Sequence, residues 1–426
     1  MLPPGPRIPP PLQVARFIRH GGTFLSECRE RYGNVFTLRM MLGRPQVMLA
    51  EPEYVRAIWS GDRRHRLNAG RRFLLEPILG RRSLLLQMGD EHLSRRRLML
   101  PPFHGERMRS YARVMEEVTV RDIERWPVGR PFPLLPVMQR ITLDVILRAV
   151  FGTTGGAREN ALRTRLSELI AATNDPKLQA LATLDWFVGR RFKPANRVLR
   201  PVDELLYEEI RERRRATDLD EREDIMSLLM LARDEDGEAL SDEELRDQLL
   251  TLLVAGHETT ATGLAWTFDA LFRHPDVLAR VKQDLGDETY LSAVCDEALR
   301  VRPVVPEVGR RLGAPVDVNG WTLPAGTDVF ASVHLMHRSP DLFPDPLAFR
   351  PERFLEDSPS TYTWIPFGGG TRRCVGAAFA QFEMRRVLAT ILEHADLEPA
   401  TTTAEPIERR PVTLAPRNGT PAVLRT

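Results

Sequence analysis

The spacing of hydrophobic residues predicts helix through most of residues 91–297. The clearest of these helices begins at Ser241, because Ser241 and Glu244 have the spacing of a capping box. Hydrophobic residues then recur at helical intervals as far as His274. Pro275 predicts the end, since proline disfavours helical geometry in the residue before it. A helix of about thirty residues is long for a globular protein, so we expect it to cross a core from side to side.

Two stretches alternate hydrophobic and polar residues in the manner of short strands, from Pro45 to Val55 and from Val316 to Val333. An amphipathic helix is predicted from Ala377 to about His394. The fold class is therefore mainly α with small β-sheets, an α+β protein around a long central helix. No repeat or low-complexity linker divides the sequence, so we expect one domain over residues 1–426.

The composition sets the broad class. The chain has 426 residues, 42% hydrophobic and 28% charged, and a formal charge of only +2. No basic stretch is interleaved with aromatic residues, so we expect no nucleic-acid partner. Three cysteines, Cys28, Cys295 and Cys374, are too few for a disulfide framework and fit a reducing cytoplasm. No signal peptide and no hydrophobic run of ~18 residues is present, so we expect a cytoplasmic protein without a membrane anchor.

The strongest chemical signal is the stretch from Phe367 to Gly376, which contains Gly368, Gly369, Gly370, Arg372 and Cys374. A cysteine just before a helix lies at the positive end of the helix dipole, which favours the thiolate. The glycines allow backbone N–H groups to turn toward the sulfur. Gly376 has no side chain, so a flat macrocycle could lie against the start of the helix.

Three other interpretations of this loop compete with a metal-binding cysteine. A phosphate-binding loop would need a Lys-Ser/Thr pair after the glycines, which is missing. A dinucleotide fingerprint would need a preceding strand and spaced glycines. An inert buried cysteine is the usual state of a single cysteine, and it stays open when the loop is taken alone.

The second signal lies in the middle of the long helix, at Ala255, Gly256, Glu258 and Thr259. A glycine inside a helix costs ~1 kcal/mol relative to alanine, so we expect it to serve packing or function. The Thr259 hydroxyl can bond to the Ala255 carbonyl and open the helix locally. Glu258 beside it can relay protons. A zinc-binding His-Glu-x-x-His helix is excluded because Ala261 stands in the final position, whereas a solvated polar patch stays open for this motif alone.

Further motifs are Glu297 with Arg300, and the run from Pro351 to Phe354 that contains Arg353. Together with the Pro-Pro-Gly-Pro start, the acid–threonine helix and the cysteine loop, they resemble the cytochrome P-450 family over essentially the whole chain. The loop fits the family pattern Phe-x-x-Gly-x-Arg-x-Cys-x-Gly at every fixed position. The resemblance implies the fold of that family, a helix-rich core around haem b, and a soluble bacterial monomer.

The resemblance also implies roles for individual residues. Cys374 would bind the iron, and Glu258 and Thr259 would be catalytic. Glu297, Arg300 and Arg353 would form a buried ion triad under the cysteine loop. The remaining contacts to the cofactor would come from His92, Arg96, Ala255, Arg310, Phe367, Gly368, Arg372 and Gly376. His334 and His337 have the spacing of a metal pair, but they match a family loop that holds no metal.

The activity implied is oxygen insertion by a haem-thiolate monooxygenase, with one atom of O2 going into the substrate. Electrons would come from NAD(P)H through a ferredoxin reductase and a ferredoxin. Two alternatives were kept: a haem-thiolate peroxygenase or isomerase, and a non-catalytic haem-based sensor. The peroxygenases lose the acid–threonine pair, which this chain has.

The resemblance places the substrate pocket among largely apolar residues, which favours a terpenoid, steroid or fatty acid. These are residues 84–87, about 166–186, Leu252, Val304, Val305, Val308 and 412–414. For the electron donor, we expect a docking surface of arginines that the cofactor does not use, namely Arg95, Arg97 and Arg373.

Overall fold

Helices dominate the fold. The computed structural model describes residues 2–40, 44–61, 72–103, 105, 107–152, 156–174, 193–357 and 359–425. Its α-helices are α1 Pro10–Tyr32, α2 Pro52–Trp59, α4 Arg72–Leu79, α5 Gly89–Met99, α6 Arg107–Ile123, α7 Leu134–Phe151, α8 Ala157–Asn174, α10 Lys193–Arg215, α11 Ile225–Leu231, α12 Asp242–Arg273, α13 Pro275–Gln283, α14 Glu288–Val301, α15 Val333–His337, α16 Arg353–Glu356 and α17 Ala377–His394. Short 3₁₀ turns occur at Pro101–Phe103, Leu219–Glu221 and Gly370–Arg372.

The strands form small separate sheets. The largest has the order β1 Val35–Met40, β2 Arg44–Leu49, β7 Asp328–Ser332 and β4 Glu307–Arg311, with β2 and β7 parallel and the other pairs antiparallel. Another sheet has the order β3 Pro131–Pro133, β11 Pro421–Leu424 and β8 Leu397–Pro399. In addition, β9 Ile407–Arg409 pairs with β10 Leu414–Pro416, and β5 Val316–Val318 pairs with β6 Trp321–Leu323. The predicted mainly α architecture with small sheets is confirmed.

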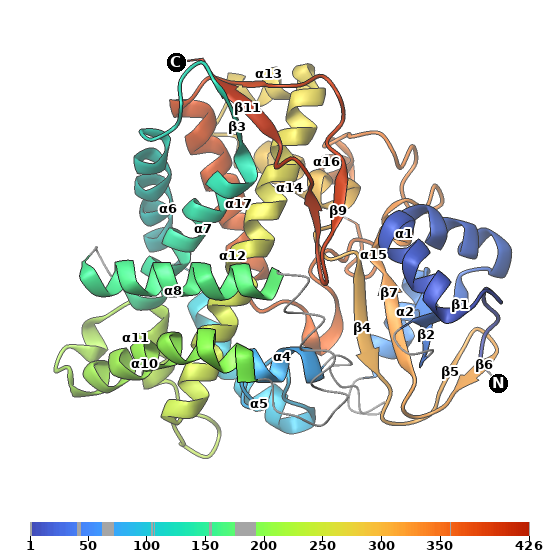
Figure 1. The fold of residues 1–426 in the computed structure, drawn as a ribbon, viewed down its shortest axis with the longest axis horizontal. Helices are drawn as coiled ribbons and strands as arrows, with labels where there is room; N and C mark the ends of the chain where they lie inside the picture. Colours follow the sequence, from blue (N-terminus) through green and yellow to red (C-terminus); the bar gives the residue numbers. More distant parts are fainter. Residues whose placement is uncertain are drawn as a thin grey trace.

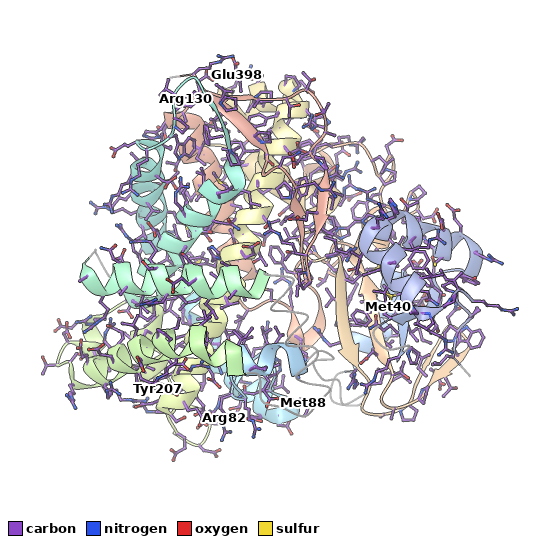
Figure 2. The ribbon with its side chains drawn as sticks, viewed as in Figure 1. Met40, Arg82, Met88, Arg130, Tyr207 and Glu398 are labelled. Carbon is purple, nitrogen blue, oxygen red and sulfur yellow. The ribbon has the colours of Figure 1, made fainter. Side chains whose placement is uncertain are left out.

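The largest sheet lies at one side of the molecule, with α1 and α2 beside it and the long helices on the other side (Figure 1). Figure 2 shows Met40 of β1 and Tyr207 of α10 on opposite sides of the molecule. Successive residues of a strand point to opposite faces. Val35 and Val47 accordingly pack in a cluster with Ile58 and Trp59 of α2, while the alternating residues, such as Phe36 and Met48, pack in another with α1.

The predicted strand from Pro45 to Val55 is right only as far as Leu49. Pro52 begins α2 and stands in its first turn. Proline is well suited to that position, because its fixed φ is already helical and its missing N–H would have no partner there. The alternation of hydrophobic residues continued into the helix by chance.

The long helix α12 was predicted closely. Its N-cap is Ser241, whose hydroxyl accepts from the Glu244 N–H at 3.2 Å, while the Glu244 carboxylate accepts from the Ser241 N–H at 3.0 Å. It runs for 32 residues and ends before His274. It packs against α7, α14 and α17, so it does cross the core.

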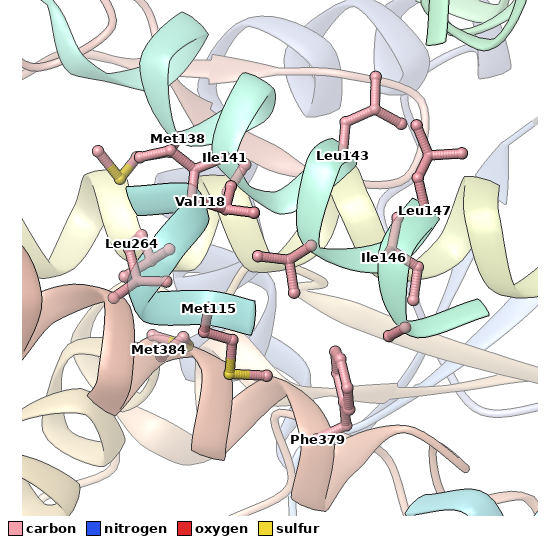
Figure 3. Packing of buried hydrophobic residues seen from close by; sticks show 14 of the residues in the cluster. Met115, Val118, Met138, Ile141, Leu143, Ile146, Leu147, Leu264, Phe379 and Met384 are labelled. Carbon is pink, nitrogen blue, oxygen red and sulfur yellow. The ribbon is translucent and has the colours of Figure 1, made fainter. Parts of the chain in front are cut away.

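The main core is built where α6, α7, α12 and α17 meet. Figure 3 shows Met115 of α6 and Met384 of α17 close to Leu264 of α12, with Met138 of α7 above them and Phe379 of α17 to one side, all in one buried cluster. Close packing of this kind fixes α12 against α17, and so fixes the middle of α12 relative to the cysteine loop that precedes α17. None of the described helices has the length and hydrophobicity needed to cross a membrane.

Candidate active site

The cysteine loop leads directly into α17. Gly368 and Gly370 have φ values of +69° and +67°, in the left-handed region that favours glycine. The Cys374 N–H donates to the Phe367 carbonyl at 2.9 Å, which closes the loop. A Cβ added to Gly376 would meet no atom within 4 Å, so the start of α17 offers the open face that a flat ring requires.

The Cys374 thiol has accessible surface, although burial is the strongest influence on its pKa. The sulfur therefore keeps accessible surface although protein atoms surround it closely. Burial raises the pKa of the thiol, and the Gly376 N–H and the charges of Arg373 and Arg96 only partly oppose this. The pKa of the thiol therefore lies above its usual value, because burial outweighs the influences that favour the thiolate. Bonding to a metal ion would supply the missing stabilisation.

A positively charged cluster lies beside the cysteine. The pKa of His92 is lowered to about 3, first by burial and then by the charges of Arg372, Arg96 and Arg310. The Nδ1 atom of His92 is buried and has no hydrogen-bond partner among the described residues. Arg372 donates to the Gln87 carbonyl at 2.7 Å, which fixes its guanidinium. Three cations around a neutral histidine form a site for carboxylates, such as the propionates of haem.

Apart from its two ends, α12 has accessible side chains only near its middle. Ala255 is exposed, and Gly256, Glu258 and Thr259 are partly exposed, although most of the helix is buried. The Thr259 hydroxyl donates to the Ala255 carbonyl at 2.7 Å, as the sequence predicted, and the Thr260 hydroxyl donates to that of Gly256 at 2.8 Å. The Thr259 side chain therefore keeps accessible surface within a helix that is mostly buried.

Glu258 is held by two side chains that the sequence did not identify. Arg410, just after β9, forms an ion pair with it, and the Gln139 amide of α7 donates to it at 2.8 Å. These partners are 152 and 119 residues away along the chain. Neither carries a motif, so nothing in the local sequence could have revealed them.

Glu297, Arg300 and Arg353 lie together in the interior. Arg300 donates to the Glu297 carboxylate through Nε at 2.6 Å and Nη2 at 2.8 Å, and Arg353 donates through Nε at 3.0 Å. The side chains of Glu297 and Arg300 are fully buried. Arg300 also donates to the carbonyls of His337, Pro346 and Ala348. The group therefore ties α14 to the segment that follows α15.

His334 and His337 each have a structural environment. His337 accepts the Ile365 N–H at Nε2, at 3.1 Å, just before the cysteine loop. His334 lies against Gly22 of α1, where an added Cβ would come within 2.8 Å of its Nε2. No group of three or more His, Cys, Asp or Glu side chains that could hold a metal ion occurs among the described residues.

The arginines expected to receive an electron donor are partly engaged elsewhere, which corrects that prediction. Arg95 is largely buried and bridges Asp234 and Glu244. Arg97 is exposed but pairs with Glu235. Of the three candidates, Arg373 is the one for which no ion pair is found among the described residues.

The expected pocket wall divides into a buried and an accessible part. Leu84, Leu252 and Val304 are buried, whereas Leu85 and Val412 are 44% and 55% exposed. Exposed hydrophobic side chains are suited to contact an apolar ligand. Residues 175–186 of the expected wall lie outside the described part of the chain.

Comparisons with known proteins give the family. A family model described as Cytochrome P450 matches residues 3–422. Putative cytochrome P450 135B1 of Mycobacterium tuberculosis is 42% identical, over 98% of this chain and 90% of its own length. Putative cytochrome P450 138 of Mycobacterium bovis is 37% identical, over 100% of this chain and 96% of its own. The solved structure of retinoic acid bound cyanobacterial CYP120A1 has a TM-score of 0.84 and 26% identity, and the match covers 100% of this chain and 99% of that one.

This chain belongs to the cytochrome P450 family of haem-thiolate monooxygenases, and it has the fold of that family. It is accordingly an oxidoreductase whose family implies a haem cofactor. The residues present fit that group: a thiol with accessible surface, a glycine at the helix start with open space beside it, and a cationic cluster around a buried nitrogen that has no hydrogen-bond partner among the described residues.

Proposed function

We propose that residues 1–426 form one haem domain that inserts one atom of O2 into an apolar, lipid-like small molecule, with electrons from a separate redox partner. The observation that carries the proposal is the convergence of Arg96, Arg310 and Arg372 on the neutral His92, beside the Cys374 thiol. A permanent cluster of partly buried cations calls for an anionic partner, and haem supplies two carboxylates.

The chain would hold haem b at three places. Cys374 would bind the iron as thiolate, and His92, Arg96, Arg310 and Arg372 would bind the propionates. Ala255, Phe367, Gly368 and Gly376 would lie against the macrocycle. The bound group would supply oxygen activation at iron, which a thiolate ligand favours.

Residues of α12 would manage protons. Because the Thr259 hydroxyl donates to the Ala255 carbonyl, the oxygen of Thr259 keeps its lone pairs and could accept a hydrogen bond from a water molecule. Glu258, held by Arg410 and Gln139, would pass protons toward that water. Both groups lie on adjacent positions of one helix, so only a short relay is needed.

The substrate class follows from the accessible apolar residues Leu85 and Val412. Burying apolar surface yields about 25 cal/mol per Å², so such a wall favours terpenoids, steroids or fatty acids over polar compounds. The similar cyanobacterial structure contains retinoic acid, an isoprenoid carboxylic acid. A spectral binding screen with these three classes, against polar compounds of matched size, would identify the class.

For electron delivery we propose a ferredoxin, reduced by NAD(P)H through its reductase, that docks close to Arg373. The charge of Arg373 acts on the Cys374 thiol, so Arg373 lies near the proposed iron ligand. Steering between exposed charges weakens as the Debye length falls from ~10 Å at 0.1 M salt to ~3 Å at 1 M. Electron transfer to Arg373→Gln should therefore be slow and less dependent on salt than in the wild type, and Arg97→Gln, which removes a charge already paired with Glu235, serves as the control.

The central test is spectroscopic. The reduced, carbon-monoxide-bound protein should show the strongly red-shifted Soret band of thiolate ligation, and Cys374→His should abolish it. A wild-type spectrum of the globin type would contradict the proposal. Turnover with hydrogen peroxide alone would instead indicate a peroxygenase, and binding without any turnover would indicate a sensor.

A further inference from the structure

A cavity lies at the C-terminal end of α12. Its volume is about 330 Å³, and its walls come from the ends of α12 and α14, from the residue after α15 and from the segment before α16. At ~1.5 Å rise per residue, Ala270 in its wall is about 16 Å along the helix from Thr259. We call it the arginine cavity.

The arginine cavity contains more positive than negative charge. Its lining includes Arg273, Arg302 and Arg338, but only one acid, Asp269. Asp269 is already committed, because it accepts from Arg273 through Nε at 3.0 Å and Nη2 at 2.7 Å. The cavity therefore has two cations in excess of its acids.

Arg302 and Arg338 are these cations. No hydrogen bond or ion pair of either side chain is found among the described residues, and the Nε of Arg302 is buried without a partner. Arg302 lies over the ring of Trp266 at 5.5 Å. Burial and then the charge of Arg302 lower the pKa of Arg338 to about 10. Two guanidinium groups that repel each other in a recess would both be stabilised by one anion between them.

The rest of the lining indicates what kind of anion fits. Trp266, Val301, Leu347 and Phe349 supply apolar walls, and Leu347 is 72% exposed and stands at the mouth. Inorganic phosphate would leave these walls unused. A molecule with one charged end and an apolar body uses both halves of the site, and pockets of ~300 Å³ and above hold small organic ligands.

We propose that the arginine cavity binds a small organic carboxylate, with its carboxylate between Arg302 and Arg338 and its apolar body against Trp266 and Phe349. The two arginines belong to segments that also hold the Glu297 group: Arg302 follows Arg300 by two residues, and Arg338 follows His337, whose carbonyl accepts from Arg300. The ligand would therefore bridge the end of α14 to the segment after α15 and stabilise the region below the cysteine loop.

The test is isothermal titration of the purified holoprotein with benzoate, inorganic phosphate and benzyl alcohol. Benzoate should bind at one site and raise the melting temperature. Arg302→Gln and Arg338→Gln should each weaken it about tenfold or more, as the loss of a charge-assisted bond predicts. Arg280→Gln is the control, because Arg280 is outside the cavity and pairs with Glu352.

A second variant guards against misfolding of the buried substitutions. Leu347→Glu changes an exposed residue and places a carboxylate at the mouth, where it should compete with benzoate and abolish binding while the fold is kept. The proposal is overturned if wild type does not bind benzoate or if Arg302→Gln and Leu347→Glu bind it unchanged. Benzyl alcohol binding as well as benzoate would refute the anion site, and tighter binding of phosphate would refute the apolar body.

Discussion

Two glutamates of this protein, Glu297 and Glu258, both pair with arginine, but their surroundings differ. Glu297 is fully buried and accepts from two arginines and from the Arg350 N–H. Glu258 is only partly buried, at the accessible middle of α12, and is held by Arg410 and Gln139. A buried carboxylate that accepts four hydrogen bonds is suited to fix structure, whereas a glutamate with accessible surface can move and exchange protons.

The largest effect is expected where the pairing is buried. Glu297→Ala would leave Arg300 and Arg353 without their carboxylate in the interior, at a cost of about 3–5 kcal/mol in the free energy of unfolding. Urea unfolding and the fraction of protein that retains haem measure it. Glu356→Ala is the control, since Glu356 pairs with Arg350 at the surface, where such pairs contribute about 1 kcal/mol or less. A small loss in Glu297→Ala would show that the group is not structural.

Each region also contains a buried histidine, and these predict a loss of stability in acid. The pKa of His337 is lowered to about 3 and that of His257 to about 4, in both cases mainly by burial. Unfolded histidine titrates near ~6.5. The unfolded chain therefore binds more protons below pH 6.5, and stability present above that pH is lost as the pH falls toward the folded values. Over this range each histidine lowers the free energy of unfolding by up to ~1.4 kcal/mol for every unit by which the pH falls.

Leucine substitutions separate the two histidines. Between pH 7 and pH 5 the urea midpoint of the wild type should fall. In His257→Leu and in His337→Leu this fall should be less steep, by the equivalent of about one bound proton. At pH 7 they should differ, because His337 accepts the Ile365 N–H and its loss leaves a buried donor unpaired, at about 1–3 kcal/mol. His257 Nδ1 has no partner among the described residues, so its variant should lose less. An unaltered pH dependence in both would show that neither histidine is kept neutral by the fold.

The sequence revealed these two regions unequally. The bounds of α12 and α17 could be predicted because caps, proline and periodicity are local signals. The acid and threonine of α12 and the cysteine loop were found by motif. Their partners were not, because Arg410 and Gln139 reach Glu258 from distant parts of the chain. The pairing of Arg95 with Asp234 and Glu244 was missed for the same reason.

On the accessible side, Thr259→Ala tests the relay. The variant should keep substrate affinity, because the hydroxyl bonds to the Ala255 carbonyl and not to the apolar wall. It should consume reductant at a similar rate but yield severalfold less product and more hydrogen peroxide, since general acid–base groups contribute ~10²–10⁴-fold to the steps they serve. Thr260→Ala is a matched control: its hydroxyl makes the same kind of bond to Gly256, but the residue is buried. An unchanged ratio of product formed to reductant consumed in Thr259→Ala would exclude the relay.

The smallest effect is expected for the side chain that only positions Glu258. Arg410→Gln removes the charge that holds the glutamate but leaves the Gln139 amide as its second donor. We expect unchanged substrate binding and stability within about 1 kcal/mol, since Arg410 is partly exposed. Product per reductant should fall about two- to fivefold, because a glutamate with one tether spends less time in the orientation that passes a proton.

The double variant Arg410→Gln/Glu258→Gln tests whether Arg410 acts through Glu258. If Arg410 acts through Glu258, the double variant should form no less product per reductant than Glu258→Gln alone. Additive losses would mean that Arg410 acts on the substrate wall independently.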